Sequence, residues 1–167
     1  MITKRTLLVG AGGAVLAIAG LRYLDAAPST AGRSFEITKT DAEWRAVLSK
    51  AQFDILRKHG TERAGTSPLN AEQRDGVYAC AGCDLDLFSS KTKYESGTGW
   101  PSFYDPLPNA IGTAEDRSLL SVRTEVHCRR CGGHLGHVFD DGPKPTGLRY
   151  CLNGLALKFK PGANAAS

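Results

Sequence analysis

The chain has 167 residues, of which 41% are hydrophobic and 23% charged, a composition typical of one globular domain with appendages. Its nineteen glycines and eight prolines favour a loop-rich β fold over a helical bundle. The net charge of +4 comes mainly from residues 1–33, which hold four basic residues and one acidic residue; the remainder holds 17 basic and 16 acidic residues. Such a balanced body offers no basic surface to a phosphate backbone, so we expect no nucleic-acid partner.

Residues 1–33 have the pattern of an export signal or membrane anchor followed by a linker. Lys4 and Arg5 precede the apolar residues 7–21, a run of about 15 that is shorter than the roughly 20 needed to span a bilayer. The segment also resembles a twin-arginine export signal, with Lys4 in place of the first arginine. We therefore expect residues 34–167 to form a domain that is periplasmic, or anchored and facing the periplasm, with the leader either cleaved or retained.

Two short helices are predicted before a β body. Residues 40–43 form a capping box, and the apolar residues that follow recur at helical spacing. A second helix is expected over residues 51–58, ending at Gly60. Short apolar or alternating runs separated by turn residues predict antiparallel strands within residues 77–160, among them 77–80, 119–122 and 150–153.

Two C-x2-C pairs, 44 residues apart, predict a tetrahedral zinc site with four cysteine ligands: Cys80, Cys83, Cys128 and Cys131. Four thiolates close the coordination sphere, so the single Zn²⁺ is expected to be structural. Two disulfides are the alternative in an exported protein, although each would close a very small loop. A mixed site that includes His134 and His137 is a further alternative, but it leaves the first cysteine pair without a role.

The fifth cysteine, Cys151, lies in a segment with strand character. Period two places Arg149, Cys151 and Asn153 on one face of this strand. A guanidinium two residues from a thiol is expected to lower the thiol pKa, as a nucleophile requires. A lone cysteine in a strand is otherwise most often a small buried hydrophobic residue, so the residues around it decide the interpretation.

Residues 99–103 (Gly-Trp-Pro-Ser-Phe), 131–143 and 149–153, together with both cysteine pairs, resemble the B-type methionine sulfoxide reductases. The resemblance covers residues 41–159. It implies a mainly β fold of two twisted antiparallel sheets, a β-tent, with short N-terminal helices. It also implies a monomeric peptide-methionine (R)-S-oxide reductase, a protein-repair enzyme that reduces the R epimer of methionine sulfoxide, chiefly in oxidised proteins.

The same resemblance implies roles for individual residues. Cys151 matches the catalytic thiol, which attacks the sulfoxide sulfur and becomes a sulfenic acid. The residues expected to assist it are His137, His134, Asn153 and Arg149. A sulfoxide becomes electrophilic when its oxygen is protonated, so His137 is the preferred proton donor, with His134 assisting. Trp100 is expected to receive the methyl group of the substrate, and Phe139 to line the same pocket.

The sequence departs from many relatives at Thr98, where they carry a resolving cysteine. Threonine forms no disulfide, and the other four cysteines are assigned to zinc. We therefore expect an external reductant, either a thioredoxin-like protein or a small thiol, to reduce the sulfenic acid of Cys151.

Two other classes of protein fit parts of the sequence. A non-enzymatic zinc-ribbon module for protein or RNA would explain the two cysteine pairs and Arg129-Arg130, but not the nearly neutral body. A thiol oxidoreductase acting on disulfides would require a C-x2-C pair free of metal.

Overall fold

The structure is a computed structural model, and it describes residues 34–118 and 121–162. The predicted leader, residues 1–33, lies outside this range. No helix within the described residues is long and apolar enough to cross a membrane. The helices and strands are α1 (Asp41–Val47), α2 (Lys50–Lys58), β1 (Gly76–Cys80), β2 (Asp86–Ser89), β3 (Lys93–Tyr94), β4 (Ser102–Phe103), β5 (Ile111–Asp116), β6 (Arg123–Cys128), β7 (His134–Phe139), β8 (Arg149–Leu152) and β9 (Leu157–Pro161), with short 3₁₀ turns η1 (Pro68–Asn70), η2 (Ser90–Thr92) and η3 (Gly154–Ala156).

Both helices begin at a capping box, in which two residues three positions apart each accept, through the side chain, a hydrogen bond from the backbone amide of the other. The predicted box at residues 40–43 starts α1, and an equivalent pair, Ser49 and Gln52, starts α2. The second helix starts one residue earlier than predicted and ends at Lys58 as predicted, but the residue that caps it is His59, whose φ of 54° is left-handed. The cap is therefore a histidine and not Gly60, which places an imidazole at the helix end.

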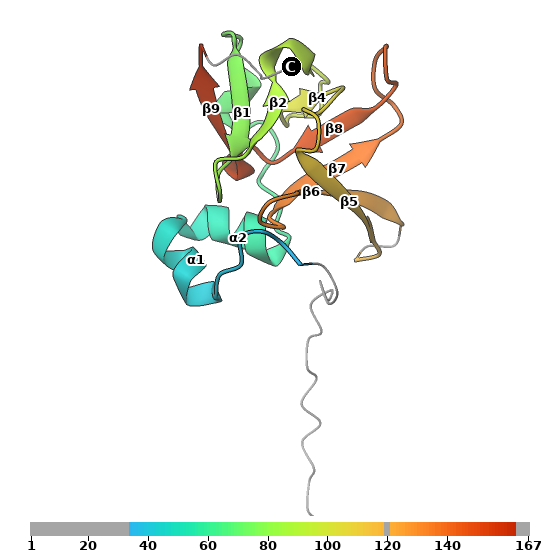
Figure 1. Cartoon of the computed structure of the whole chain (residues 1–167). Helices are drawn as coiled ribbons and strands as arrows, with labels where there is room; N and C mark the ends of the chain where they lie inside the picture. Colours follow the sequence, from blue (N-terminus) through green and yellow to red (C-terminus); the bar gives the residue numbers. More distant parts are fainter. Residues whose placement is uncertain (1–33, 119–120, 163–167) are drawn as a thin grey trace, which may run out of the picture. The chain divides into compact units, whose positions relative to one another are not determined.

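The strands form two antiparallel sheets, as predicted. One has the order β2-β1-β9, and the other has the order β3-β4-β8-β7-β6-β5. Figure 1 shows the smaller sheet beside the larger one, with both helices below them. The prediction of a strand over residues 119–122 is wrong where it can be compared: β6 starts at Arg123, and Val122 is exposed instead of packed in a sheet.

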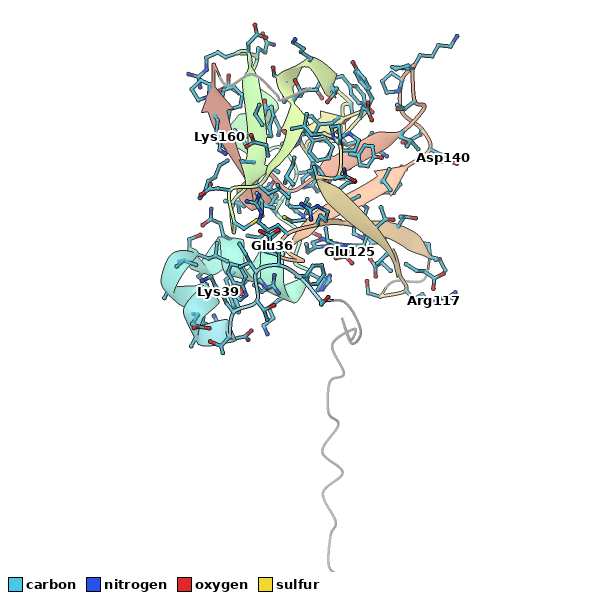
Figure 2. The ribbon with its side chains drawn as sticks, in the orientation of Figure 1. Glu36, Lys39, Arg117, Glu125, Asp140 and Lys160 are labelled. Atoms are coloured by element: carbon cyan, nitrogen blue, oxygen red, sulfur yellow. The ribbon has the colours of Figure 1, made fainter. Side chains whose placement is uncertain are left out.

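Aromatic side chains join the two sheets. Tyr78 of β1 and Phe88 of β2 both contact Phe103 of β4, with ring centroids 4.9 and 4.7 Å away, and all three are fully buried. Trp44 and Phe53 extend the same core into the helices. Charged side chains such as Lys39, Asp140 and Lys160 lie around the outside of this core (Figure 2).

Candidate active site

The register between β7 and β8 places His137 directly opposite Cys151. The predicted period of two is confirmed on β8, because Tyr150 and Leu152 are buried whereas Arg149 and Cys151 are half-buried on the other face. The strand ends at Leu152, however, and the next residue turns into η3. Strand pairing alone thus brings together the thiol and a histidine that are 14 residues apart in the sequence.

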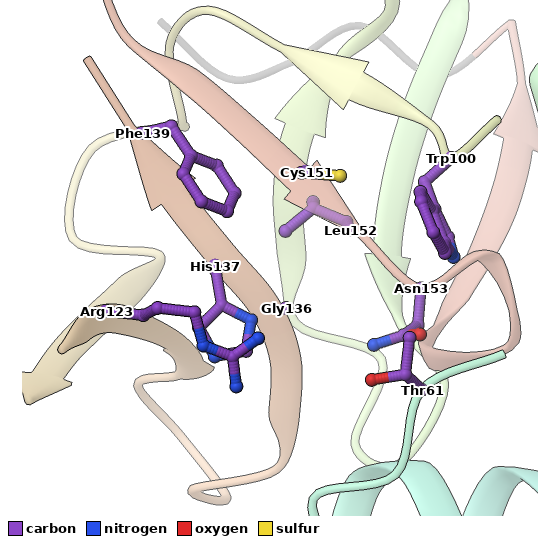
Figure 3. Close-up of a pocket in the computed structure, with 9 residues that line it drawn as sticks. All are labelled: Thr61, Trp100, Arg123, Gly136, His137, Phe139, Cys151, Leu152 and Asn153. Carbon is purple, nitrogen blue, oxygen red and sulfur yellow. The ribbon is translucent and has the colours of Figure 1, made fainter. Parts of the chain in front are cut away.

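A pocket opens above these two strands, with the sulfur of Cys151 between Phe139 and Trp100 (Figure 3). The residues that line it are Thr61, Trp100, Arg123, Gly136, His137, Phe139, Cys151, Leu152 and Asn153. Five of the seven predicted site residues outside the cysteine pairs therefore meet in one place: Trp100, His137, Phe139, Cys151 and Asn153. The combination of apolar rings, one thiol and one imidazole suits a small, largely apolar group that reacts with sulfur.

Burial raises the pKa of the Cys151 thiol above its ordinary value of 9.0, although a hydrogen bond with Thr98 and the charge of Arg149 act in the opposite direction. The prediction that Arg149 produces a low thiol pKa is therefore wrong in its net direction. Burial is the main cause, and Arg149 offsets it only in part while it is also paired with Asp141: Nε and an Nη atom donate to the two carboxylate oxygens of Asp141, each at 2.8 Å. The thiol is thus protonated in the free protein at neutral pH.

His137 is held by a carboxylate on β5. Its Nε2 lies 2.7 Å from Oδ2 of Asp116, which also accepts from Arg123 at 2.6 Å. Burial lowers the pKa of His137 below 6.5 despite this hydrogen bond. The imidazole is therefore neutral at pH 7, and donation from Nε2–H to Asp116 leaves Nδ1 free to accept a proton.

His134 lies behind the pocket and not in its lining. Its side chain is 2% exposed, and Nδ1 lies 2.8 Å from Oε1 of Glu125, which His59 also contacts at 3.0 Å. Glu125 lies on β6 (Figure 2), and its contact with His59 links it to the residue that caps α2. The ring of His134 packs edge-on against that of His137, with centroids 5.4 Å apart. Its contact with the site is therefore made through His137.

The loop after α2 holds the opposite wall of the pocket. The backbone carbonyl of Glu62 accepts from Nε1 of Trp100 at 3.1 Å, and its carboxylate accepts from the amides of Gly154 and Leu155. Its amide donates to Oδ1 of Asn153. This single buried residue thus orients both the indole and the turn that follows β8.

Asn153 is positioned differently from the prediction that it shares a strand face with Cys151. It is 4% exposed and follows the end of β8. Its Oδ1 accepts from Glu62 and its Nδ2 donates to the carbonyl of Leu135, so the side chain links backbone segments. One Nδ2 hydrogen remains to face the pocket, as Figure 3 indicates.

Two contacts complete the surroundings of the thiol. The guanidinium of Arg149 covers the ring of Phe139, with its central carbon 4.4 Å from the centroid, which fixes the ring at the edge of the pocket. Oγ1 of Thr98 lies 3.8 Å from Sγ of Cys151. Thr98, the position at which the resemblance implies a resolving cysteine in many relatives, therefore lies beside the thiol of Cys151.

The four remaining cysteines cluster at the junction of the two sheets. Cys80 ends β1 and Cys128 ends β6, while the other two follow in the tight turns after them. All four Sγ atoms lie within 4.8 Å of one another, and the pairs Cys80–Cys131 and Cys83–Cys128 are separated by 3.7 and 3.5 Å. All four are free thiols in the structure, so neither C-x2-C pair forms the alternative disulfide.

The cluster has the geometry of a metal centre. A tetrahedron with metal–sulfur bonds of about 2.3 Å has edges of about 3.8 Å, close to the observed separations. The four thiols can therefore bind a metal ion without rearrangement. The alternative site with two histidines is wrong, because the ligand atoms that cluster with the cysteines are those of the four cysteines and include neither His134 nor His137.

Sequence reasoning missed Asp116 and Arg123, which hold His137, and it assigned no role to Glu62. Asp116 lies on β5, three strands away from the β8 strand of Cys151 and two away from the β7 strand of His137, and it reaches the histidine only through the order of the larger sheet. No spacing in the sequence marks that contact. For Glu62, the signal was the Thr61-Glu62 pair at the end of the helical segment, which fits the resemblance but indicates no partner.

Comparison with known proteins now defines the class. A family model described as the SelR domain matches residues 48–161, from the end of α1 to the end of β9. Three curated relatives come from Leptospira interrogans (52% identical over 128 residues, 76% of this chain and 98% of the relative), Pseudomonas entomophila (54% over 127 residues, 75% and 97%) and Thiobacillus denitrificans (55% over 124 residues, 74% and 94%).

All three relatives are named peptide methionine sulfoxide reductase MsrB. The chain belongs to this SelR-domain family of peptide-methionine (R)-S-oxide reductases, which are oxidoreductases acting on sulfur. This confirms the resemblance found in the sequence, and it sets aside the zinc-ribbon binding module as an alternative.

Proposed function

We propose that this chain reduces the R epimer of methionine sulfoxide, chiefly in oxidised proteins, and that Cys151 is the nucleophile. The observation that carries the proposal is the half-buried thiol of Cys151 in a pocket with Trp100 and His137, apart from the four clustered cysteines. The family relationship supports methionine sulfoxide as the substrate and a thiol as the reductant.

The pocket supports this substrate through its shape and chemistry. The indole of Trp100 is fixed by its hydrogen bond to Glu62, and Phe139 is fixed by Arg149. Two immobile rings on either side of a thiol suit the S-methyl group of methionine sulfoxide. The sulfoxide oxygen is then directed to the polar side of the pocket, where His137 and Asn153 lie.

The proton needed for the reaction is carried by Cys151 itself. Because the thiol is protonated and His137 is neutral, the histidine acts as a shuttle: Nδ1 takes the thiol proton and delivers it to the sulfoxide oxygen. Asp116 stabilises the imidazolium that forms in between, through Nε2. His134 positions the ring of His137 by edge-on packing and does not itself touch the substrate.

The chemical step is balanced without any further group. Sγ of Cys151 bonds to the sulfoxide sulfur and the oxygen receives the thiol proton. The hydroxyl then moves to Sγ, and its bond to the substrate sulfur and the bond between the two sulfurs break, which leaves methionine and a cysteine sulfenic acid. One external thiol then displaces water from the sulfenic acid to give a mixed disulfide. A second thiol releases Cys151 and leaves as a disulfide with the first.

The need for an external thiol rests on Thr98. Its hydroxyl lies 3.8 Å from Sγ of Cys151, and threonine forms no disulfide. The other cysteines are the proposed zinc ligands: Cys80, Cys83, Cys128 and Cys131. Bound there, Zn²⁺ supplies structural cross-linking of the two sheets, and it takes no part in the reduction.

The test is turnover of separated R and S methionine sulfoxide peptides by the wild type and by Cys151→Ser. We expect turnover of the R peptide only, and none by the variant. Equal rates on both epimers would contradict the proposed stereospecificity, and an active Cys151→Ser variant would contradict the proposed nucleophile. Intact mass after one turnover without reductant should show one added oxygen.

A further inference from the structure

A row of three hydroxyl groups leads away from the sulfur of Cys151. Oγ1 of Thr98 lies 3.8 Å from Sγ, Oγ of Ser96 lies 2.8 Å from Thr98, and Oγ of Ser102 lies 2.7 Å from Ser96. The row ends where Ser102 donates to the backbone carbonyl of Trp100 at 3.1 Å. Four consecutive contacts therefore connect the thiol to the backbone of the pocket wall.

The fold holds this row in place. Ser102 is fully buried and is the direct partner of Cys151 in the pairing of β4 with β8. The amide of Leu152 donates to the carbonyl of Pro101, which fixes the same junction. Ser96 and Thr98 belong to the loop before β4 and are half-buried, so strand pairing and the loop place all three hydroxyls within the protein.

Counting protons determines the direction of these hydrogen bonds. Each hydroxyl has one proton, and that of Ser102 is used on the carbonyl of Trp100. Ser96 must then donate to Ser102, and Thr98 to Ser96. The thiol of Cys151 is left to donate to Thr98. When the sulfur is protonated, every hydrogen bond in the row is therefore donated in the direction that leads from Cys151 to Trp100.

A thiolate at Cys151 can only accept, which requires the opposite direction. Thr98 then donates to Sγ, Ser96 donates to Thr98, and Ser102 donates to Ser96. Thr98 and Ser96 each keep a donor and an acceptor, whereas Ser102 keeps only its acceptor and the carbonyl of Trp100 loses the hydrogen bond from Ser102. The reversal needs rotation of three hydroxyl groups and no movement of heavy atoms.

We propose that Thr98, Ser96 and Ser102 form a reversible hydroxyl chain that turns to donate to the sulfur of Cys151 as its proton leaves. The proposal rests on the proposed function, in which Cys151 is the nucleophile. It gives Thr98 a positive role: the residue that replaces a resolving cysteine stabilises the attacking thiolate and directs it toward the pocket.

The other charged and titratable groups around the sulfur of Cys151 do not fully stabilise a thiolate there, so hydrogen bonds from the hydroxyl chain can contribute. Arg149 lies beside Cys151 on β8, but its guanidinium is paired with Asp141, whose charge opposes the thiolate. Tyr94 of β3 and neutral His137 of β7 also lie near it, and Arg123 of β6 lines the same pocket, where it is paired with Asp116. Burial raises the thiol pKa, and among the contributions that lower it the hydrogen bond with Thr98 comes first, ahead of the charge of Arg149 and a hydrogen bond with Arg149.

The test is the pH dependence of Cys151 alkylation by iodoacetamide in the full, metal-loaded chain, with the modified peptide identified by mass. Thr98→Val keeps the shape and removes the hydroxyl, and we expect the midpoint to rise by about one pH unit, the effect of one hydrogen bond to a charged group. Thr98→Ser should restore the wild-type midpoint. Ser96→Ala should shift it in the same direction by less, because Thr98 then loses its own donor.

Ser89→Ala, which removes a hydroxyl from the cap of η2, is the matched control and should leave the midpoint unchanged. The proposal is overturned if Thr98→Val keeps the wild-type midpoint, if Thr98→Ser shifts as far as Thr98→Val, or if Ser96→Ala has no effect. Retained metal content checks that each variant is folded. Reduction of the R peptide by the wild type, abolished in Cys151→Ser, would uphold the proposed function even if the hydroxyl chain failed this test.

Discussion

At the scale of single residues, burial decides the protonation of the pair that performs the chemistry. The pKa of Cys151 is raised and that of His137 is lowered, in both cases chiefly because the charged form loses water. The pair therefore starts the reaction with its proton on sulfur. Sequence analysis placed Arg149 near the thiol correctly. It predicted neither the burial of the thiol nor the pairing of Arg149 with the carboxylate of Asp141.

Thr98→Cys is expected to give the protein an internal disulfide. The side-chain oxygen at this position is already 3.8 Å from Sγ of Cys151, so a thiol there reaches bonding distance with a small adjustment. After one turnover without reductant, intact mass should show the loss of two hydrogens, where the wild type gains one oxygen. Thr98→Ser is the control, and an added oxygen in Thr98→Cys would contradict the expectation.

At the scale of elements, the site is a product of strand register. β7 and β8 approach closely because Gly136 has no side chain: a Cβ there would lie 2.1 Å from the carbonyl oxygen of Cys151. The adjacent pair in the register is His137 and Cys151. The separation of β7 and β8 therefore determines how the thiol of Cys151 and the imidazole of His137 lie relative to each other.

Gly136→Ala is expected to force β7 and β8 apart, with a loss of about 1–3 kcal/mol in the free energy of unfolding. It should also lower kcat on the R peptide, because the thiol and His137 move relative to each other. Denaturant unfolding and turnover rates measure the two effects. Gly82→Ala is the control, since its added Cβ meets nothing closer than 3.5 Å; similar behaviour of the two variants would exclude the register explanation.

The elements also indicate where sequence-based prediction succeeds. Local signals were sufficient for the first capping box, for the alternating burial on β8 and for the two cysteine pairs. They failed where partners are distant: Asp116 reaches His137 from β5, and Glu62 reaches the turn after β8 across 91 residues or more. Such contacts depend on sheet order, which no local pattern in one sequence contains.

At the scale of the whole molecule, the four-cysteine cluster joins the smaller sheet to the larger one. It connects the end of β1 with the end of β6, and α2 packs beside it, where Arg57 donates to the carbonyl of Cys131 at 2.9 Å. A metal bound at these thiols is bound only by the folded chain, so its binding free energy adds to the stability of the fold.

Removal of the metal with a chelator is therefore expected to lower Tm by roughly 10 °C or more. Cys83→Ser should have a comparable effect and should reduce the bound metal, measured by elemental analysis. Cys151→Ser should retain one metal per chain and most of the stability. Loss of metal in Cys151→Ser would show that the assignment of the five cysteines is wrong.

The stability of the fold should also depend on Glu125 at acid pH. Burial alone raises the pKa of Glu125, but hydrogen bonds with His134 and His59 outweigh it and hold the pKa well below 4.5. A carboxylate with a lowered folded pKa adds stability that is complete above the unfolded value and is lost as the pH falls below it. The free energy of unfolding should therefore decline between about pH 5 and pH 2.

Glu125→Gln should make this decline shallower, because the amide does not titrate, and denaturant unfolding of both proteins at a series of pH values measures the difference. The metal site is present in both proteins, so its own acid sensitivity cancels in the comparison. Glu115→Gln, an exposed change on β5, serves as the control. Parallel curves for the wild type and Glu125→Gln would contradict the expected contribution.

The bonds made by Glu62 have a consequence for how the pocket opens. Its carboxylate holds the amide hydrogens of Gly154 and Leu155, while its carbonyl holds the indole of Trp100. Exchange of these two amide hydrogens with heavy water thus reports on detachment of the loop after α2, separately from global unfolding. A bound substrate that packs against Trp100 should slow the exchange of these two amide hydrogens. Their exchange rates would then report whether the pocket is occupied.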